Sequence, residues 1–199
     1  KFYRKFIIKP SLNYFIFKNF IHDSKLLHAG CGSGQVDADI NKRMSVTGLD
    51  ISPVALSLYK KTNVKNINLL HGSILDIPIQ NNYFDGVYNL GVMEHFNEYE
   101  IRKILQEFYR VLKPGGKIVL FWPPRFGISV IFLEFTHTIL NLFSKQDISL
   151  HPPEITRIRS KKQIENYLNQ SGFKLKSYYF GVRDLFTQVA IVGEKINEK

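Results

Sequence analysis

Short apolar runs alternate along this chain with segments of helical character. The runs that predict strands cover residues 26–29, 45–50, 66–71, 83–90 and 117–122. Between them, helical character is predicted for residues 35–44, 53–62 and 97–112. The last helix is the most strongly amphipathic, because its apolar residues share one face: Ile101, Ile104, Leu105, Phe108 and Leu112. This alternation predicts an α/β fold with an open, doubly wound and mostly parallel sheet.

The alternation breaks at Pro123-Pro124 and resumes near residue 160. Residues 127–143 carry their apolar positions on one helical face, which predicts a helix inside an insertion at residues 123–159. Beyond it the pattern predicts a helix and two strands, at residues 161–170, 174–181 and 186–194. The link between these two strands is too short for a parallel crossover, so they should form an antiparallel hairpin. The sheet then has about seven strands.

The first 24 residues mix aromatic side chains with lysines. Pro10 is expected to separate two short helical pieces, and Ser11 to cap the second. The aromatic face of this segment is interpreted as packing on the core, with a lid or interfacial helix as the alternative. A single domain is expected, with a helical cap, a core, a cap insertion and a C-terminal helix with hairpin, at residues 1–24, 25–122, 123–159 and 160–199.

Composition narrows the class of protein. The chain has 199 residues, 44% of them hydrophobic and 22% charged, which is typical of one globular domain. The net charge of +10 can steer anionic ligands, nucleic acid or a membrane surface, or it can be a solvated surface bias. Cys31 is the single cysteine, so no intramolecular disulfide forms and a reducing compartment is indicated. With neither a signal peptide nor a spanning segment apparent, we expect a cytoplasmic location, with peripheral contact with a membrane as the alternative.

A glycine-rich stretch follows the first predicted strand. Gly30, Gly32 and Gly34 come directly after an apolar run and before a segment of helical character. Strand, glycine turn and helix start are how α/β proteins present backbone N–H groups to a ligand. A dinucleotide-binding fingerprint would place its third glycine at position 35, where this chain has Gln35. A nicotinamide dehydrogenase is therefore disfavoured.

Four motifs in order resemble those of class I S-adenosylmethionine-dependent methyltransferases, of the small-molecule type called methyltransferase type 11. They are His28-Ala29-Gly30-Cys31-Gly32-Ser33-Gly34, Gly48-Leu49-Asp50-Ile51-Ser52, Phe84-Asp85-Gly86-Val87-Tyr88-Asn89 running into Val92-Met93-Glu94-His95, and Leu112-Lys113-Pro114-Gly115-Gly116. The resemblance covers residues 25–195, including the terminal hairpin. It implies a Rossmann-like fold and S-adenosylmethionine as cofactor, with S-adenosylhomocysteine as product.

The resemblance also implies a set of cofactor-binding residues: His28, Gly30, Cys31, Gly32, Gly34, Asp50, Ile51, Ser73, Ile74, Asn89 and Leu90. The glycines would contact the methionine and ribose portions, and the Asp50 carboxylate would accept both ribose hydroxyls. Ile51 would pack on the adenine. The carbonyl groups of Gly30 and Asn89 would accept from the ammonium group. All would lie at the carboxyl ends of strands, where open α/β sheets bind ligands.

Two positions depart from the family pattern. The family usually has an acid where His28 stands, and a histidine cannot offer a carboxylate to the ammonium group. The family also usually has an acid at Ser73, which contacts the adenine amino group; Asp76 is a candidate substitute. Both changes remove negative charge, so an altered cofactor affinity or pH dependence is predicted.

Methyl transfer from a sulfonium is an in-line displacement, so positioning supplies most of the catalysis. A general base is needed only for a weakly acidic hydroxyl or a protonated amine. His95 is the candidate by position, with a structural role as the alternative; His137 and His151 are further candidates. No cluster with metal-ligand spacing is visible, so no metal is expected.

The sequence therefore predicts an S-adenosylmethionine-dependent methyltransferase that acts on a small molecule, with an amphiphilic or anionic acceptor as the finer expectation. The aromatic segments flanked by Lys and Arg also predict peripheral contact with an anionic membrane or a lipid-linked substrate. Two alternatives remain open, a catalytically silent cofactor-binding partner subunit and an RNA methyltransferase. Nucleic acid is disfavoured, because the chain lacks an appended RNA-binding module and an Asn/Asp-Pro-Pro-Tyr motif.

Overall fold

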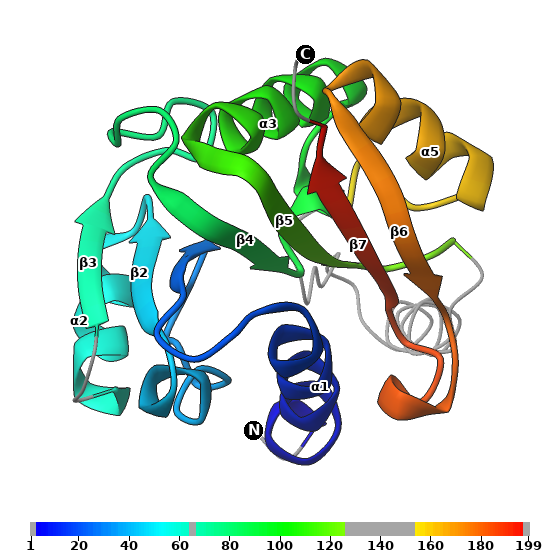
Figure 1. Cartoon of the computed structure of the whole chain (residues 1–199). Coiled ribbons are helices and arrows are strands. Elements are labelled where there is room, and N and C mark those ends of the chain that lie inside the picture. Colours follow the sequence, from blue (N-terminus) through cyan, green and yellow to red (C-terminus); the bar gives the residue numbers. More distant parts are fainter. Residues whose placement is uncertain (1–2, 64–66, 126–153, 197–199) are drawn as a thin grey trace, which may run out of the picture.

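A computed structural model describes residues 3–63, 67–125 and 154–196 of the chain. Its centre is one seven-stranded sheet with the strand order β3-β2-β1-β4-β5-β7-β6 (Figure 1). The strands are β1 (Lys25–Ala29), β2 (Ser45–Asp50), β3 (Ile67–His71), β4 (Phe84–Leu90), β5 (Leu112–Trp122), β6 (Phe173–Tyr179) and β7 (Val189–Lys195). The predicted α/β fold with seven strands is confirmed.

The strands β1 to β5 pair in parallel, and β7 pairs antiparallel with both β5 and β6. The predicted terminal hairpin is therefore confirmed. Its connection is longer than the sequence indicated, because a 3₁₀ turn, η4 (Val182–Asp184), and the residues after it separate β6 from β7. The sheet thus has five parallel strands whose carboxyl ends share one edge, and that edge is where ligands bind in open α/β sheets.

Helices cover both faces of the sheet (Figure 1). On one face, α3 (Glu98–Val111) and α5 (Lys161–Gln170) pack their buried apolar side chains into the larger hydrophobic core. On the other face lie α1 (Lys9–Asn19) and α2 (Pro53–Thr62). Asn97 and Glu100 form a capping box at the start of α3, a feature that contributes about 1 kcal/mol to a helix. None of the described helices is long and apolar enough to cross a membrane.

The predicted helix at residues 35–44 is wrong. The chain there makes successive turns and one short 3₁₀ helix, η2 (Ile40–Lys42). Asp37 and Asn41 turn their polar side chains inward and bond to partners on other elements, and Asn63 bonds to the carbonyl of Gly34. Short polar side chains that bind elsewhere compete with a regular helix, so the segment follows these bonds.

The N-terminal segment forms a π-helical turn, η1 (Arg4–Ile8), that runs into α1. The two helical pieces meet beside Pro10, which lies in the first turn of α1, where its missing N–H costs no hydrogen bond. The prediction that Ser11 caps the second piece is wrong, because Ser11 lies inside α1 and is buried.

Strand β5 begins at Leu112, directly after α3, rather than at residue 117. The shift of register between β4 and β5 near Gly86 accommodates Pro114-Gly115-Gly116. The predicted helix at residues 127–143, and most of the predicted insertion, lie outside the described residues.

Candidate functional site

A cavity of about 450 Å³ opens at the carboxyl ends of β1 and β4. Its floor is the glycine loop that follows β1, and one wall is the segment that follows β4. The N-terminal residues Tyr3, Arg4 and Ile8 close another side, and Glu154 and Gln188 complete it. A cavity of this size, set at the edge where ligands bind in α/β sheets, fits a small molecule or a nucleotide-like cofactor.

All three glycines of the loop have positive φ angles, at 72°, 52° and 62° for Gly30, Gly32 and Gly34. A Cβ atom at Gly30 would lie 2.7 Å from Val92 Cγ2, and one at Gly34 would lie 2.3 Å from Tyr59 Cδ2. At Gly32 a Cβ would meet nothing within 4 Å. The outer glycines therefore allow close packing of the loop, whereas Gly32 leaves open space for a bound group.

Asp50 ties the loop to the end of β2. Its Oδ2 accepts a hydrogen bond from the Gly32 N–H at 2.8 Å, and its Oδ1 accepts one from the Ser52 N–H at 2.9 Å. Ser52 caps α2 through its own hydroxyl, which accepts from the N–H of Ala55, so Asp50 is not the cap. Each carboxylate oxygen has two acceptor sites and uses one here, which leaves one site on each oxygen for a ligand.

The structure gathers seven of the predicted site residues around the cavity: His28, Gly30, Cys31, Gly32, Gly34, Leu90 and His95. The other five predicted residues do not line it. Ile51 is 72% exposed, and its carbonyl lies 3.0 Å from His71 Nε2. Ser73 accepts a hydrogen bond from the Leu75 N–H, and Ile74 is buried. His137 and His151 lie outside the described residues.

Asn89 lies behind the site rather than on its surface. Asn89 is fully buried at the end of β4, where its amide donates to the Ala29 carbonyl at 2.9 Å, so it links β4 to β1 directly below the glycine loop. Among the described residues its Oδ1 has no hydrogen-bond partner.

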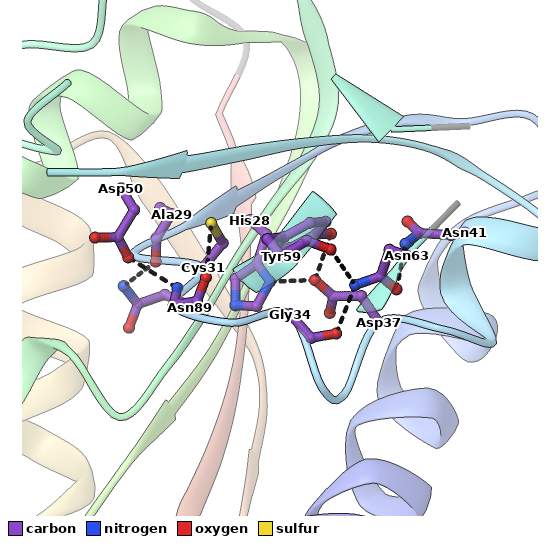
Figure 2. Close-up of polar contacts among 11 residues, drawn as sticks. His28, Ala29, Cys31, Gly34, Asp37, Asn41, Asp50, Tyr59, Asn63 and Asn89 are labelled. Carbon is purple, nitrogen blue, oxygen red and sulfur yellow. Dashed lines mark hydrogen bonds and ion pairs between the residues drawn. The ribbon is translucent and has the colours of Figure 1, made fainter. Parts of the chain in front are cut away.

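His28, at the end of β1, is paired with a carboxylate that the sequence did not indicate (Figure 2). His28 Nδ1 lies 2.6 Å from Asp37 Oδ2, and the Tyr59 hydroxyl donates to the same oxygen at 2.7 Å. The His28 ring also stacks on Tyr88, with 4.4 Å between ring centroids. All four side chains of this cluster are buried, and His28 alone of the four lines the cavity.

The cluster sets the protonation of its neighbours. Burial, and then the negative charge of Asp37, raise the pKa of the Tyr59 hydroxyl, so Tyr59 keeps its proton and acts as a donor. Burial raises the pKa of Cys31 as well, with further contributions from Asp50 and Asp37. A thiol in this environment is not a thiolate near neutral pH, and a nucleophilic role for Cys31 is disfavoured.

Sequence reasoning missed Asp37 because it placed residues 35–44 on a helix. The available signal was an acid flanked by Val36 and Ala38 in a stretch with apolar residues on both sides. A charged residue in such a stretch is rarely buried unless it is paired.

A second carboxylate lines the cavity at Glu94, in the 3₁₀ helix η3 (Met93–His95) after β4. Glu94 is 5% exposed, and burial raises its pKa to about 7, with Glu154 adding to the shift. Its carbonyl accepts hydrogen bonds from the N–H groups of Ile155 and Thr156, which fixes the segment that returns to the site. Glu94 and the half-buried His95 are neighbours in η3, and both line the same cavity as the glycine loop.

The lining fits a ligand that carries both hydroxyl and cationic groups. The acids Asp37, Glu94 and Glu154 lie at or behind the cavity wall, and the open space at Gly32 borders Asp50. Such a donor and acceptor set suits the ribose and ammonium groups of S-adenosylmethionine.

Comparison with known proteins defines the class. A profile of the family described as Methyltransferase domain matches residues 27–120. A demethylmenaquinone methyltransferase of Geobacillus sp. (strain WCH70) is 29% identical over 153 residues, and the match covers 69% of this chain and 64% of that protein. The chain thus spans less than two thirds of the length of that relative.

Two solved structures share the fold. A SAM-dependent methyltransferase from Methanosarcina mazei has a TM-score of 0.72 at 20% identity, over 92% of this chain and 98% of that chain. A Burkholderia thailandensis 1,6-didemethyltoxoflavin-N1-methyltransferase with bound S-adenosylhomocysteine has a TM-score of 0.69 at 12% identity, over 96% and 77%. The fold is that of the class I methyltransferases. Residues 27–120 thus match a methyltransferase domain, and the described fold around them is that of S-adenosylmethionine-dependent methyltransferases.

Proposed function

We propose that this enzyme methylates a small amphiphilic or anionic acceptor in the cavity between the glycine loop and Glu94-His95. The observation that carries the proposal is that one cavity is lined both by Gly32, with its open face, and by Glu94 and His95. Bound S-adenosylmethionine supplies a methyl group on a sulfonium, with a neutral thioether as the leaving group. The protein has to hold donor and acceptor in line, and positioning of this kind supplies most of the rate.

The cofactor-binding residues are assigned as the sequence indicates. Asp50 offers one acceptor site on each carboxylate oxygen to the two ribose hydroxyls, while the Gly32 and Ser52 N–H groups keep the carboxylate oriented. Ile51, Ser73 and Ile74 follow the ends of β2 and β3, where Asp50 and His71 are register partners, so they lie at the same edge as Asp50. They are proposed to contact the adenine.

His95 is the proposed general base for an acceptor that must lose a proton. Glu94 is the nearest alternative, because a carboxyl group with a pKa of about 7 can take up a proton at neutral pH. Replacement of each by its neutral amide-bearing counterpart, His95→Asn and Glu94→Gln, separates the two roles. Replacement of a general base should lower kcat and change its pH profile, whereas replacement of a residue that only binds the acceptor should raise KM.

The acceptor is proposed to be amphiphilic because the described surface near the mouth is apolar and basic. Phe6, Val182 and Leu185 are each more than half exposed. The Tyr3 hydroxyl donates to Thr187, which holds the N-terminal turn against the hairpin connection next to the cavity. Similarity to relatives named demethylmenaquinone methyltransferases supports an acceptor of this class. A cytoplasmic enzyme in peripheral contact with an anionic membrane fits these features.

Vesicle co-sedimentation tests the membrane part. We expect the protein to bind vesicles containing phosphatidylglycerol more strongly than pure phosphatidylcholine vesicles, and Phe6→Ser with Leu185→Ser to reduce that binding. Ile21→Ser is the matched control, because Ile21 is 82% exposed but lies beside Lys113 and Gly116, at the other end of the strands. Equal binding to both vesicle types would remove the membrane from the proposal. An untargeted screen with methyl-labelled cofactor identifies the acceptor itself.

A further inference from the structure

The hydrogen-bond geometry of the His28–Asp37 pair shows which group donates the proton and which accepts it. A 2.6 Å separation between His28 Nδ1 and Asp37 Oδ2 requires a proton between them. Asp37 Oδ2 already accepts the hydroxyl proton of Tyr59, so Asp37 acts as the carboxylate acceptor of both bonds. The proton therefore lies on Nδ1, which leaves Nε2 on the opposite side of the ring.

Nε2 is the ring nitrogen of His28 that the bond to Asp37 leaves for another partner. His28 lines the cavity, and among the described residues its ring makes one side-chain hydrogen bond, to Asp37. In the neutral ring with a proton on Nδ1, Nε2 carries a lone pair and accepts a hydrogen bond. The same logic orients histidines in catalytic triads and metal sites, where a carboxylate fixes the tautomer from behind.

The charge of Asp37 has no cationic side chain of Lys or Arg to balance it within the described part of the chain. Asp37 is fully buried, and an uncompensated buried carboxylate is costly. Glu94 and Glu154 add acidic groups on the same cavity, and Arg4, the one Lys or Arg among its described lining residues, is exposed to solvent. The His28 end of the cavity is thus suited to a cationic group.

We propose that His28 and Asp37 together bind the ammonium group of the cofactor's methionine moiety: Nε2 accepts one of its protons, and Asp37 supplies the negative charge from behind the ring. This inference rests on the proposed function, and it replaces the direct carboxylate of the family pattern by a carboxylate that acts through an imidazole. His28 touches the ligand, and Asp37 is a positioning residue.

The test uses ligands that differ in the groups near His28. S-adenosylhomocysteine has both ammonium and carboxylate groups, decarboxylated S-adenosylmethionine keeps only the ammonium group, and methylthioadenosine has neither. In calorimetric titrations, Asp37→Asn should weaken the affinity for the two ammonium-bearing ligands by about tenfold or more. The affinity for methylthioadenosine should stay within about twofold of the wild-type value. The amide can donate to Nδ1, which moves the ring proton to Nε2 and turns the acceptor into a donor.

A rescue variant sharpens the result. The double variant His28→Asp with Asp37→Asn places a carboxylate directly at the end of β1, and it should recover most of the affinity for the two ammonium ligands. Tyr59→Phe is the matched control, because it removes the other bond to Asp37 Oδ2 but keeps the charge and the His28 pair. It should change these affinities by less than about threefold.

A measurement on the unmodified protein protects the test against variants that do not fold. In ¹⁵N NMR spectra of the complex with S-adenosylhomocysteine, His28 should show a protonated Nδ1 and an unprotonated, hydrogen-bonded Nε2. A protonated Nε2 would overturn the inference, as would a loss of affinity in Asp37→Asn that is confined to the carboxylate-bearing ligand. Wild-type affinity in Asp37→Asn would also overturn it while leaving the proposed function intact. Failure of the wild-type protein to bind S-adenosylhomocysteine would instead remove the proposed function.

Discussion

Two aspartates near the glycine loop are fixed by different kinds of hydrogen-bond partner. Asp50 is half-buried and is fixed by backbone N–H groups, from Gly32 and Ser52. Asp37 is fully buried and is fixed by side chains, from His28 and Tyr59. The first arrangement depends on residues close to the loop and keeps its oxygens accessible to a ligand. The second depends on three elements meeting in the folded chain, and we propose that it acts on the ligand through His28.

The largest expected effect comes from the glycine that packs on the Asp37 side. Gly34→Ala places a Cβ 2.3 Å from Tyr59 Cδ2 at a φ of 62°, so Tyr59 must move away from Asp37. We expect a loss of about 4 kcal/mol in the free energy of unfolding, measured by urea denaturation. Gly115→Ala is the matched control, with a φ of 71° but nothing within 4 Å of the new Cβ, and it should cost only about 1 kcal/mol. Equal losses would show that Tyr59 packing is not what the loop depends on.

Removal of the two carboxylates separates stability from binding. Asp37→Ala leaves buried His28 and Tyr59 without their partner and should lower the free energy of unfolding by about 3 kcal/mol. Asp50→Ala loses bonds to two N–H groups at a half-buried position and should cost about 1 kcal/mol, yet it should weaken cofactor binding more. Urea denaturation and calorimetry on both variants check the contrast. The reverse order of stabilities would contradict it.

Glu94 extends the comparison to a carboxyl group without a fixed partner. Its folded pKa of about 7 lies above the ordinary value of 4.5, so the folded state binds more protons than the unfolded state between these values. Stability attributable to Glu94 is therefore lost as pH rises, by about 2 kcal/mol between pH 5 and pH 7. The difference in unfolding free energy between the wild type and Glu94→Gln, followed across this window, isolates the contribution. A difference that does not change with pH would exclude the raised pKa.

The smallest expected effect is a change in the reactivity of Cys31, whose thiol pKa both aspartates raise. Asp50→Asn and Asp37→Asn should each speed thiol alkylation, and Asp50→Asn should do so more, because Asp50 makes the larger contribution. Because Cys31 is the single cysteine, the total alkylation rate at pH 8 reports on it directly. A slower reaction in either variant would mean that its charge does not reach the thiol.

The fold was predictable to the extent that it depends on periodic burial. The parallel strands, α3 and the antiparallel ending follow from apolar runs, helical spacing and a short link, and all are present. The segment after the glycine loop was not predictable in this way, because Asp37 and Asn41 are fixed by Tyr59, His28 and Asn63 rather than by their neighbours in sequence. Periodicity carries no information about such bonds.

The same distinction applies to the candidate site. Asp50 ends a strand and can be assigned from its place in a motif, as can the glycines that form the cavity floor. Asp37 belongs to no motif, and its role depends on the unusual His28 at the end of β1. The family pattern therefore predicts where the site lies, whereas the carboxylate that we propose in place of the family's acid can be found only from the folded structure.

The central claim is that the cavity above Gly30, Gly32 and Gly34 binds S-adenosylmethionine with Asp50 on the ribose. Calorimetric titration of S-adenosylhomocysteine into the wild type and Asp50→Ala tests it most directly. We expect the wild type to bind and Asp50→Ala to lose at least about tenfold in affinity while it keeps a cooperative unfolding transition. Unchanged affinity in Asp50→Ala, or no binding to the wild type, would contradict the account.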